Sequence, residues 1–193
     1  MSLDFDSARL YNPNMTPSHE EWRAQLRRFV DAEIMPHAED WDEAGEIPTE
    51  LWPKAAAVGL LGLGYPEQYG GTPGDVWFSQ IANEELSRVG VGGVNASLMV
   101  HGIGLPPVIN WGSEAMKEQV APPVLRGEAW ISLGITEPGG GSDVANLQTT
   151  AVRDGDHFVV NGSKTYITGG MRANWVSTAV RTGGEGATGV SML

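Results

Sequence analysis

The sequence predicts an α+β protein in which a helical region comes first and a β region follows. Apolar residues recur at helical spacing in the first part of the chain, whereas from Ala129 onward they form short strand-like runs between turn residues. Two polar loops, at 136–143 and 164–169, lie in the stretch where this period changes. A junction of this kind is a natural place for a ligand.

Composition indicates a soluble globular protein, since 41% of the 193 residues are apolar and 19% are charged. The formal net charge of -12 disfavours nucleic acid and anionic membrane surfaces as partners. The chain has no Cys, which excludes disulfides, thiolate metal sites and Cys nucleophiles. No apolar run reaches the roughly 20 residues of a membrane span, and the N-terminus is acidic where a signal peptide would be basic. We therefore expect a cytoplasmic protein.

The first helix is predicted to begin at Ser18-His19-Glu20-Glu21, which has the pattern of a capping box. Apolar residues then follow at helical spacing on one face, and Pro36 is expected to break or kink the run. These apolar residues are Trp22, Leu26, Phe29, Val30 and Ile34. Arg23, Arg27 and Arg28 are interpreted as a solvated face.

Further helices are expected up to residue 128. Small and apolar residues on nearly every face indicate that one of them, beginning at Val94, is buried among the others. Ser113 is expected to cap the last helix and Gly127 to end it. The expected ranges are Leu51–Val58, Asp75–Leu86, Val94–Trp111 and Glu114–Leu125.

The second part of the chain is expected to contain strands and hairpin turns. Asp154-Gly155 is a favoured two-residue hairpin turn, and Asn161-Gly162 predicts another turn, into a strand that begins at Lys164. The expected strands are Ala129–Ile135, Leu147–Val152, His157–Val160, Lys164–Ile167, Trp175–Val180 and Gly189–Leu193. Because the last strand ends in apolar residues with no turn after it, we expect the natural protein to continue past Leu193.

The glycine-rich loop at 139–141 does not fit three familiar phosphate or hydrolase motifs. A Walker loop needs Lys and then Ser or Thr after its last Gly, but Gly134 and Gly139 are followed by Gly140 and Gly141. A Rossmann fingerprint and a nucleophile elbow would both need a small residue at Val144. The alternative that stays open is a tight connection between strands that glycines permit.

The sequence gives little support for a metal site or for acid–base catalysis. The four histidines are scattered, and none has a second ligand at helical spacing, so no metal site is predicted. His101 is interpreted as a hydrogen-bonded core histidine. Glu137 and Asp143 flank the glycine-rich loop, where carboxylates can act as acid and base or can equally cap loop N–H groups.

Three segments in the same order resemble the acyl-CoA dehydrogenase family. They are ITEPGGGSD at 135–143, NGSKTYIT at 161–168 and PEQYGG at 66–71. The resemblance covers essentially the whole chain. It implies an N-terminal α-helical domain at residues 1–128, followed by an incomplete middle β domain at residues 129–193, which would form a partial antiparallel β-barrel-like domain that contacts FAD and substrate.

The resemblance also implies roles for individual residues. Thr136 and Thr168 stand where the family hydrogen-bonds the pyrimidine edge and the N5 region of the flavin of FAD, and Ser142 stands where it contacts acyl-CoA. The remaining positions that would line the flavin are Leu133, Ile135, Tyr166 and Ile167. Many members have Trp at the position of Tyr166 and Asn at the position of Gly169, so this chain departs from the pattern there.

The activity implied is FAD-dependent α,β-dehydrogenation of an acyl-CoA or acyl-carrier thioester to the trans-2-enoyl thioester. Electron-transferring flavoprotein would accept the electrons, and the complete enzyme would be a homotetramer or homodimer. The catalytic base is expected beyond Leu193, in a C-terminal helical domain that is not present. The alternatives are a flavin monooxygenase or oxidase of the same fold, and a non-catalytic fragment or binding module.

Overall fold

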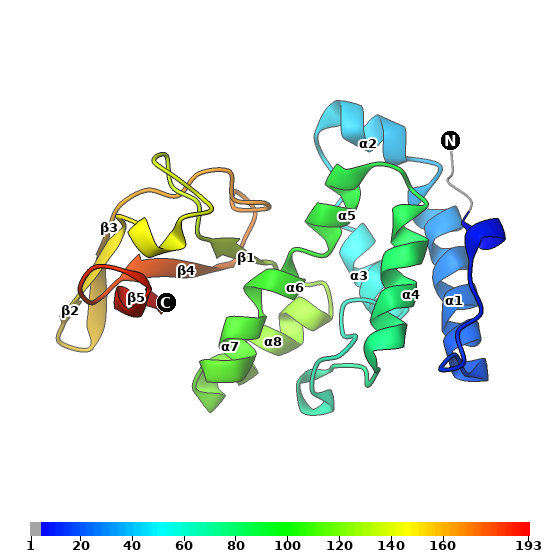
Figure 1. The fold of residues 1–193 in the computed structure, drawn as a ribbon, viewed down its shortest axis with the longest axis horizontal. Coiled ribbons are helices and arrows are strands. Elements are labelled where there is room, and N and C mark those ends of the chain that lie inside the picture. Colours follow the sequence, from blue (N-terminus) through cyan, green and yellow to red (C-terminus); the bar gives the residue numbers. More distant parts are fainter. Residues whose placement is uncertain (1–4) are drawn as a thin grey trace. The chain divides into compact units, whose positions relative to one another are not determined.

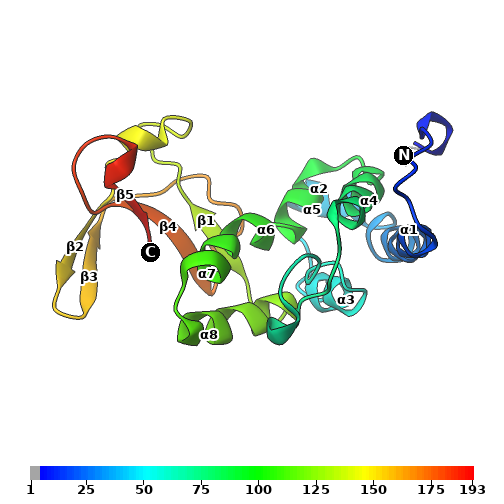
Figure 2. The ribbon, with the colours of Figure 1, turned by 60° about the horizontal axis from the view of Figure 1, so that its bottom comes forward.

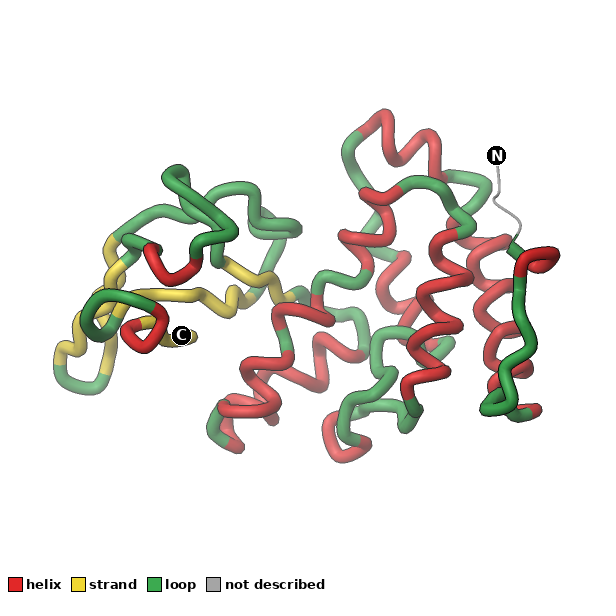
Figure 3. The backbone as a smooth tube through the Cα atoms, viewed as in Figure 1, coloured by secondary structure: helices red, strands yellow, loops and turns green. Residues whose placement is uncertain are grey.

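The computed structural model describes residues 5–193. The chain divides into two compact units. The first unit contains the chain up to Met99 together with 118–129, and the second contains 100–117 and 130–193. All the strands belong to the second unit, as the yellow segments of Figure 3 show. The predicted order, a helical region and then a β region, is confirmed. The domain boundary at residues 128 and 129 stays a prediction.

The helices and strands have the following bounds. The α-helices are α1 (Pro17–Phe29), α2 (Ala38–Ala44), α3 (Leu51–Ala57), α4 (Val76–Ser87), α5 (Gly92–Leu98), α6 (His101–Gly104), α7 (Pro106–Trp111) and α8 (Glu114–Leu125). The strands are β1 (Ile131–Gly134), β2 (Thr150–Asp154), β3 (His157–Asn161), β4 (Trp175–Arg181) and β5 (Val190–Met192). Within the described residues, no helix is both long enough and apolar enough to cross a membrane.

Helix α1 begins earlier than predicted, and its cap differs from the predicted one. Thr16 is the N-cap and Pro17 is the first helical residue, a position that suits proline because its missing N–H would have no helical partner. His19 takes the place that Glu21 was expected to fill, since its Nδ1 accepts the backbone N–H of Thr16 at 3.0 Å. Its Nε2 lies 3.1 Å from Oδ1 of Asp75, the N-cap of α4, so His19 connects the starts of both helices.

The interface between α1 and α4 contains a buried carboxylate that binds several arginines. Glu85 is only 1% exposed, and its two oxygens accept Nε and Nη2 of Arg27, both at 2.9 Å. Arg23 is 4% exposed, and its Nη1 lies 3.3 Å from the same carboxylate. The interpretation of Arg23, Arg27 and Arg28 as a solvated face is therefore wrong for Arg23 and Arg27. Figure 1 shows α1 and α4 side by side.

The single buried helix expected from Val94 to Trp111 is wrong, because the segment forms the three short helices α5, α6 and α7. Pro106 starts α7, and a proline inside a longer helix would remove a backbone hydrogen bond and clash with the preceding turn. Gly104, at the end of α6, packs directly on β1: a Cβ there would lie 2.8 Å from the carbonyl oxygen of Ile131. Ser177 of β4 donates its hydroxyl to the Gly104 carbonyl at 2.7 Å.

The sheet has the order β1-β4-β2-β3, and β5 pairs with β4. It is mixed, where an antiparallel arrangement was expected: β1 and β2 each run parallel to β4, whereas β2–β3 and β4–β5 are antiparallel. In the second unit, Figure 2 shows the β2–β3 hairpin projecting from the other strands. Its two turn residues are Gly155 and Asp156, one position later than predicted, and Gly155 has the positive φ of 64° that the turn requires.

The expected strand Lys164–Ile167 does not form. This segment has no strand assignment, and its backbone instead pairs with the loop after β1, where the Thr165 N–H donates to the Thr136 carbonyl at 2.9 Å. The segment is therefore a loop held by another loop.

Replacing Glu85 by Gln should strongly destabilise the protein, because it removes the charge that compensates buried arginines. We expect the free energy of unfolding to fall by about 3 to 5 kcal/mol, the usual cost of breaking a buried ion pair. Urea denaturation measures it. Glu33→Gln is the matched control, since its pair with Lys54 is exposed and should contribute less than about 1 kcal/mol. Equal effects of the two substitutions would contradict the buried-carboxylate interpretation.

Candidate functional site

The candidate site is built from two loops of the second unit that run side by side. The first loop (135–143) follows β1, and the second loop (162–169) follows β3. Besides the Thr165–Thr136 backbone bond, the Ser132 hydroxyl of β1 donates to the Thr168 carbonyl at 2.7 Å. The structure therefore brings Thr136 and the segment around Thr168 into one connected region, as the sequence predicted for them.

The Lys164 side chain of the second loop forms hydrogen bonds to the first loop. This side chain is only 12% exposed, and its ammonium donates to the Ile135 carbonyl at 3.0 Å and to Glu137 Oε1 at 2.8 Å. A nearly buried ammonium needs such partners because its desolvation is costly. Lys164 lies within the NGSKTYIT motif, but this role was not predicted from the sequence. The available signal was a basic residue next to a polar loop.

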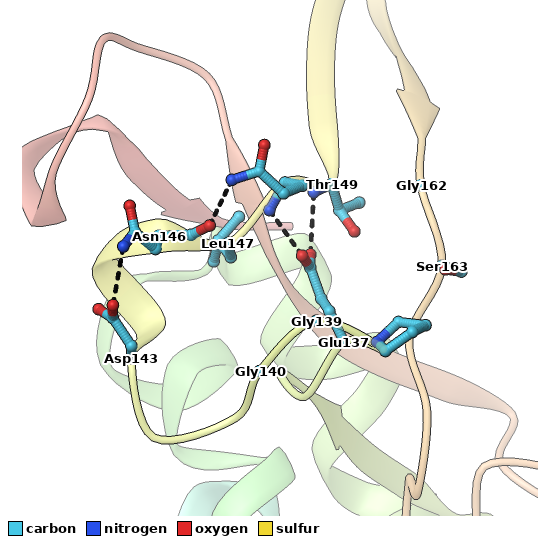
Figure 4. Close-up of a pocket in the computed structure, with 11 residues that line it drawn as sticks. Glu137, Gly139, Gly140, Asp143, Asn146, Leu147, Thr149, Gly162 and Ser163 are labelled. Atoms are coloured by element: carbon cyan, nitrogen blue, oxygen red, sulfur yellow. Dashed lines mark hydrogen bonds between the residues drawn. The ribbon is translucent and has the colours of Figure 1, made fainter.

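Glu137 is the partner of Lys164 and also organises the first loop. Its carboxylate accepts the backbone N–H groups of Gln148 at 2.6 Å and Thr149 at 2.9 Å, as the dashed lines in Figure 4 show. The Glu137 N–H donates to the Gly140 carbonyl at 2.9 Å, which closes the glycine-rich turn. Of the two interpretations left open for this carboxylate, capping of loop N–H groups is the one that the geometry supports.

The environment of Glu137 lowers its pKa to about 2. Burial of the carboxyl raises the pKa, but the hydrogen bonds from Lys164, Thr149 and Gln148 favour the charged form and outweigh burial. Glu137 is therefore an anion at neutral pH and does not have the raised pKa of a general acid.

A cavity of about 530 Å³ lies beside the first loop. Its lining includes Glu137, Asp143, Thr149, Gly162 and Ser163. Asp143 accepts the side-chain amide of Asn146 at 2.8 Å, so this carboxylate also stabilises its own loop. Gly162 has φ of 154° and no room for a side chain, because a Cβ there would lie 2.4 Å from the Thr149 hydroxyl oxygen.

The other predicted site residues differ in exposure. Leu133, Ile135, Thr136 and Ile167 are partly exposed, whereas Ser142 and Thr168 are exposed. The first loop folds back on Thr136, since a Cβ at Gly141 would lie 3.3 Å from Thr136 Cγ2. Gly141, which precedes Ser142, therefore lies close to the Thr136 side chain.

Tyr166 has the most unusual conformation in the second loop. It is 92% exposed, and its φ of 57° places a non-glycine residue in the left-handed region. Such a conformation persists where the surrounding structure imposes it, and it is concentrated at functional sites. The neighbouring anchors at Lys164 and at Thr168 supply that constraint.

The residues of these loops fit a flat heteroaromatic ring with a polar edge. Thr136 and Thr168 carry hydroxyl groups, Leu133 and Ile167 are partly exposed apolar residues, and Tyr166 has an exposed aromatic ring. The isoalloxazine ring of FAD has this combination of surfaces. In the part of the chain that the structure describes, no group of three or more His, Asp or Glu side chains could hold a metal ion.

The depressed pKa of Glu137 predicts a pH-dependent contribution to stability. Because the folded-state pKa of about 2 lies below the ordinary glutamate pKa of 4.5, this stabilisation is complete above about pH 5 and is lost as the pH falls toward 2. The difference in unfolding free energy between the native protein and Glu137→Gln should therefore shrink across that range. Denaturant titrations between pH 2 and 7 measure it, and a difference that does not vary with pH would contradict the ion pair.

Comparison with known proteins shows where this architecture occurs. Residues 16–128 match the family "Acyl-CoA dehydrogenase, N-terminal domain", and residues 132–193 match "Acyl-CoA dehydrogenase, middle domain". The acyl-CoA dehydrogenase AFT10-1 of Alternaria alternata is 37% identical over 96% of this chain and 46% of its own length.

Solved structures agree in fold as well as in sequence. A probable acyl-CoA dehydrogenase from Mycobacterium abscessus is 50% identical with a TM-score of 0.89, over 93% of this chain and 48% of that one. A glutaryl-CoA dehydrogenase from Mycobacterium smegmatis in complex with FADH2 is 30% identical with a TM-score of 0.82, over 92% of this chain and 45% of that one.

The chain thus spans less than half the length of each of these relatives. Two adjoining family matches, a shared fold and the paired loops agree that the chain belongs to the acyl-CoA dehydrogenase family, of which it contains the N-terminal and middle domains.

Proposed function

We propose that this chain supplies the flavin-facing part of an enzyme that oxidises an acyl-CoA thioester to the trans-2-enoyl thioester. The observation that carries the proposal is the pairing of the two loops, which holds Thr136 and Thr168 in one connected region. The solved glutaryl-CoA dehydrogenase relative that contains FADH2 supports FAD as the cofactor.

The residues of the chain would bind and orient the cofactor. Thr136 and Thr168 would donate hydrogen bonds to the polar edge of the flavin, while Leu133, Ile135 and Ile167 would pack on its apolar surface. Tyr166 would contribute its ring to the same surface, and Ser142 would contact the acyl-CoA. Donors that are fixed before binding stabilise developing negative charge without a cost of reorganisation. FAD, when bound, supplies the hydride acceptor.

Other parts of the proposed function lie outside the residues of this site. The base that removes the α-proton is not assigned to any residue of this chain. Electron-transferring flavoprotein is the proposed electron acceptor, a homo-oligomer is the proposed assembly, and the cytoplasm is the proposed location. An acyl-carrier thioester is an alternative form of the substrate with the same reacting carbons.

Thr136→Val and Thr168→Val should each weaken FAD binding by about 3- to 10-fold, because each removes one hydroxyl while it preserves the shape of the side chain. Titration of the purified protein with FAD, followed by flavin fluorescence, measures this. Thr182→Val is the matched control, since that hydroxyl pairs with Ser191 near the end of β4 and should not affect binding.

Acyl-CoA-dependent reduction of an electron-accepting dye by the FAD-loaded, full-length natural protein tests the reaction itself. Dye reduction that requires both FAD and acyl-CoA supports dehydrogenation. Failure of the full-length natural protein to bind FAD would contradict the proposal, and so would rapid consumption of oxygen by its reduced flavin, which indicates an oxidase or monooxygenase.

A further inference from the structure

We propose that Lys164 is a positioning residue that sets the direction of the Thr136 peptide N–H, so that this N–H becomes a fixed donor to the flavin. This inference rests on the proposed function and adds to it a residue that is not itself expected to touch the cofactor. The observation behind it is the hydrogen bond from the Lys164 ammonium to the Ile135 carbonyl, at 3.0 Å.

Because a peptide unit is planar, the bond from Lys164 to the Ile135 carbonyl also fixes the direction of the Thr136 N–H. The Ile135 carbonyl and the Thr136 N–H belong to one planar peptide unit, and in a trans peptide they point in opposite directions. The described residues contain no cis peptide bond. Because Lys164 holds the carbonyl toward the interior of the two loops, the Thr136 N–H must point away from Lys164.

The next peptide unit is held in the same way. The Thr136 carbonyl accepts the Thr165 N–H at 2.9 Å, and the Glu137 N–H on the other side of that unit donates to Gly140 at 2.9 Å. Both peptide units that flank Thr136 are therefore oriented by the protein.

Glu137 keeps Lys164 in place. The ammonium has two named acceptors, Ile135 and Glu137, and the Glu137 carboxylate is itself held by the N–H groups of Gln148 and Thr149. The hydrogen bonds therefore connect the residues just before β2, through Glu137 and Lys164, to the peptide unit that precedes Thr136. The Lys164 side chain as a whole is only 12% exposed, so most of it is shielded from water.

The chemical consequence concerns the reduced cofactor. A flavin that accepts a hydride gains negative charge, and a donor already aimed at it stabilises that charge more than it stabilises the oxidised ring. If Lys164 orients such a donor, its removal should weaken binding of the reduced flavin more than binding of the oxidised flavin. A lysine that only stabilises the fold would not produce this difference.

The test compares Lys164→Met with Lys164→Arg, which retains the charge and can donate to both acceptors. Lys117→Met is the matched control, because Lys117 forms an ion pair of the same 2.8 Å length with Glu114 on α8. We expect Lys164→Met to weaken binding of oxidised FAD by about 10-fold and to make the midpoint potential of the bound flavin more negative. Lys164→Arg should restore most of both properties, and Lys117→Met should change neither.

Amide hydrogen exchange of the protein without FAD gives a second readout. In Lys164→Met the N–H groups of Thr165, Gln148 and Thr149 should exchange faster than in the native protein, because the loops lose their connection. Glu137→Gln, which retains one acceptor oxygen, should produce a smaller change of the same kind and serves as the second variant if Lys164→Met does not fold.

The outcomes separate the two proposals. If the full-length natural protein does not bind FAD, the proposed function fails, and unchanged exchange in the variants would show independently that the loops do not depend on Lys164. If the native protein binds FAD but Lys164→Met has the potential and affinity of Lys117→Met, the positioning role is overturned and the proposed function stands.

Discussion

The ion pair between Lys164 and Glu137 is the interaction on which the candidate site depends. Both side chains are nearly buried, and together they satisfy the Ile135 carbonyl and the N–H groups of Gln148 and Thr149. Without it, a loop rich in glycine would have little to restrict its backbone, since glycine permits many conformations. The pair fixes the first loop, and the backbone bond between Thr165 and Thr136 then fixes the second loop against it.

Much of the fold was predictable because local signals and tertiary structure agree. Ser113 caps the start of α8 and the left-handed Gly127 lies just beyond its end, as the sequence predicted. The three motifs also identified the family and the two loops. Leu133 lies in β1, and Thr136 and the other predicted cofactor residues lie in these loops, but their roles in binding stay predictions.

The predictions that were wrong depend on contacts between residues far apart in the sequence, which local sequence patterns do not reveal. Lys164–Ile167 has the composition of a strand, yet its hydrogen bonds go to a loop that is distant in sequence. Arg23 and Arg27 lie off the apolar face of α1, but Glu85 on α4 provides a buried partner for them. The parallel pairing of β1 with β4 likewise depends on contacts between segments far apart in the chain.

The central claim is that the two loops form one cofactor-binding surface. Titration of the isotopically labelled protein with FAD, followed by two-dimensional amide NMR, tests it most directly. The expected result is that signals from 133–136 and 166–168 shift together with a single dissociation constant, while signals from α1 and α4 do not move. Shifts confined to one loop, or concentrated in the first unit, would contradict the claim.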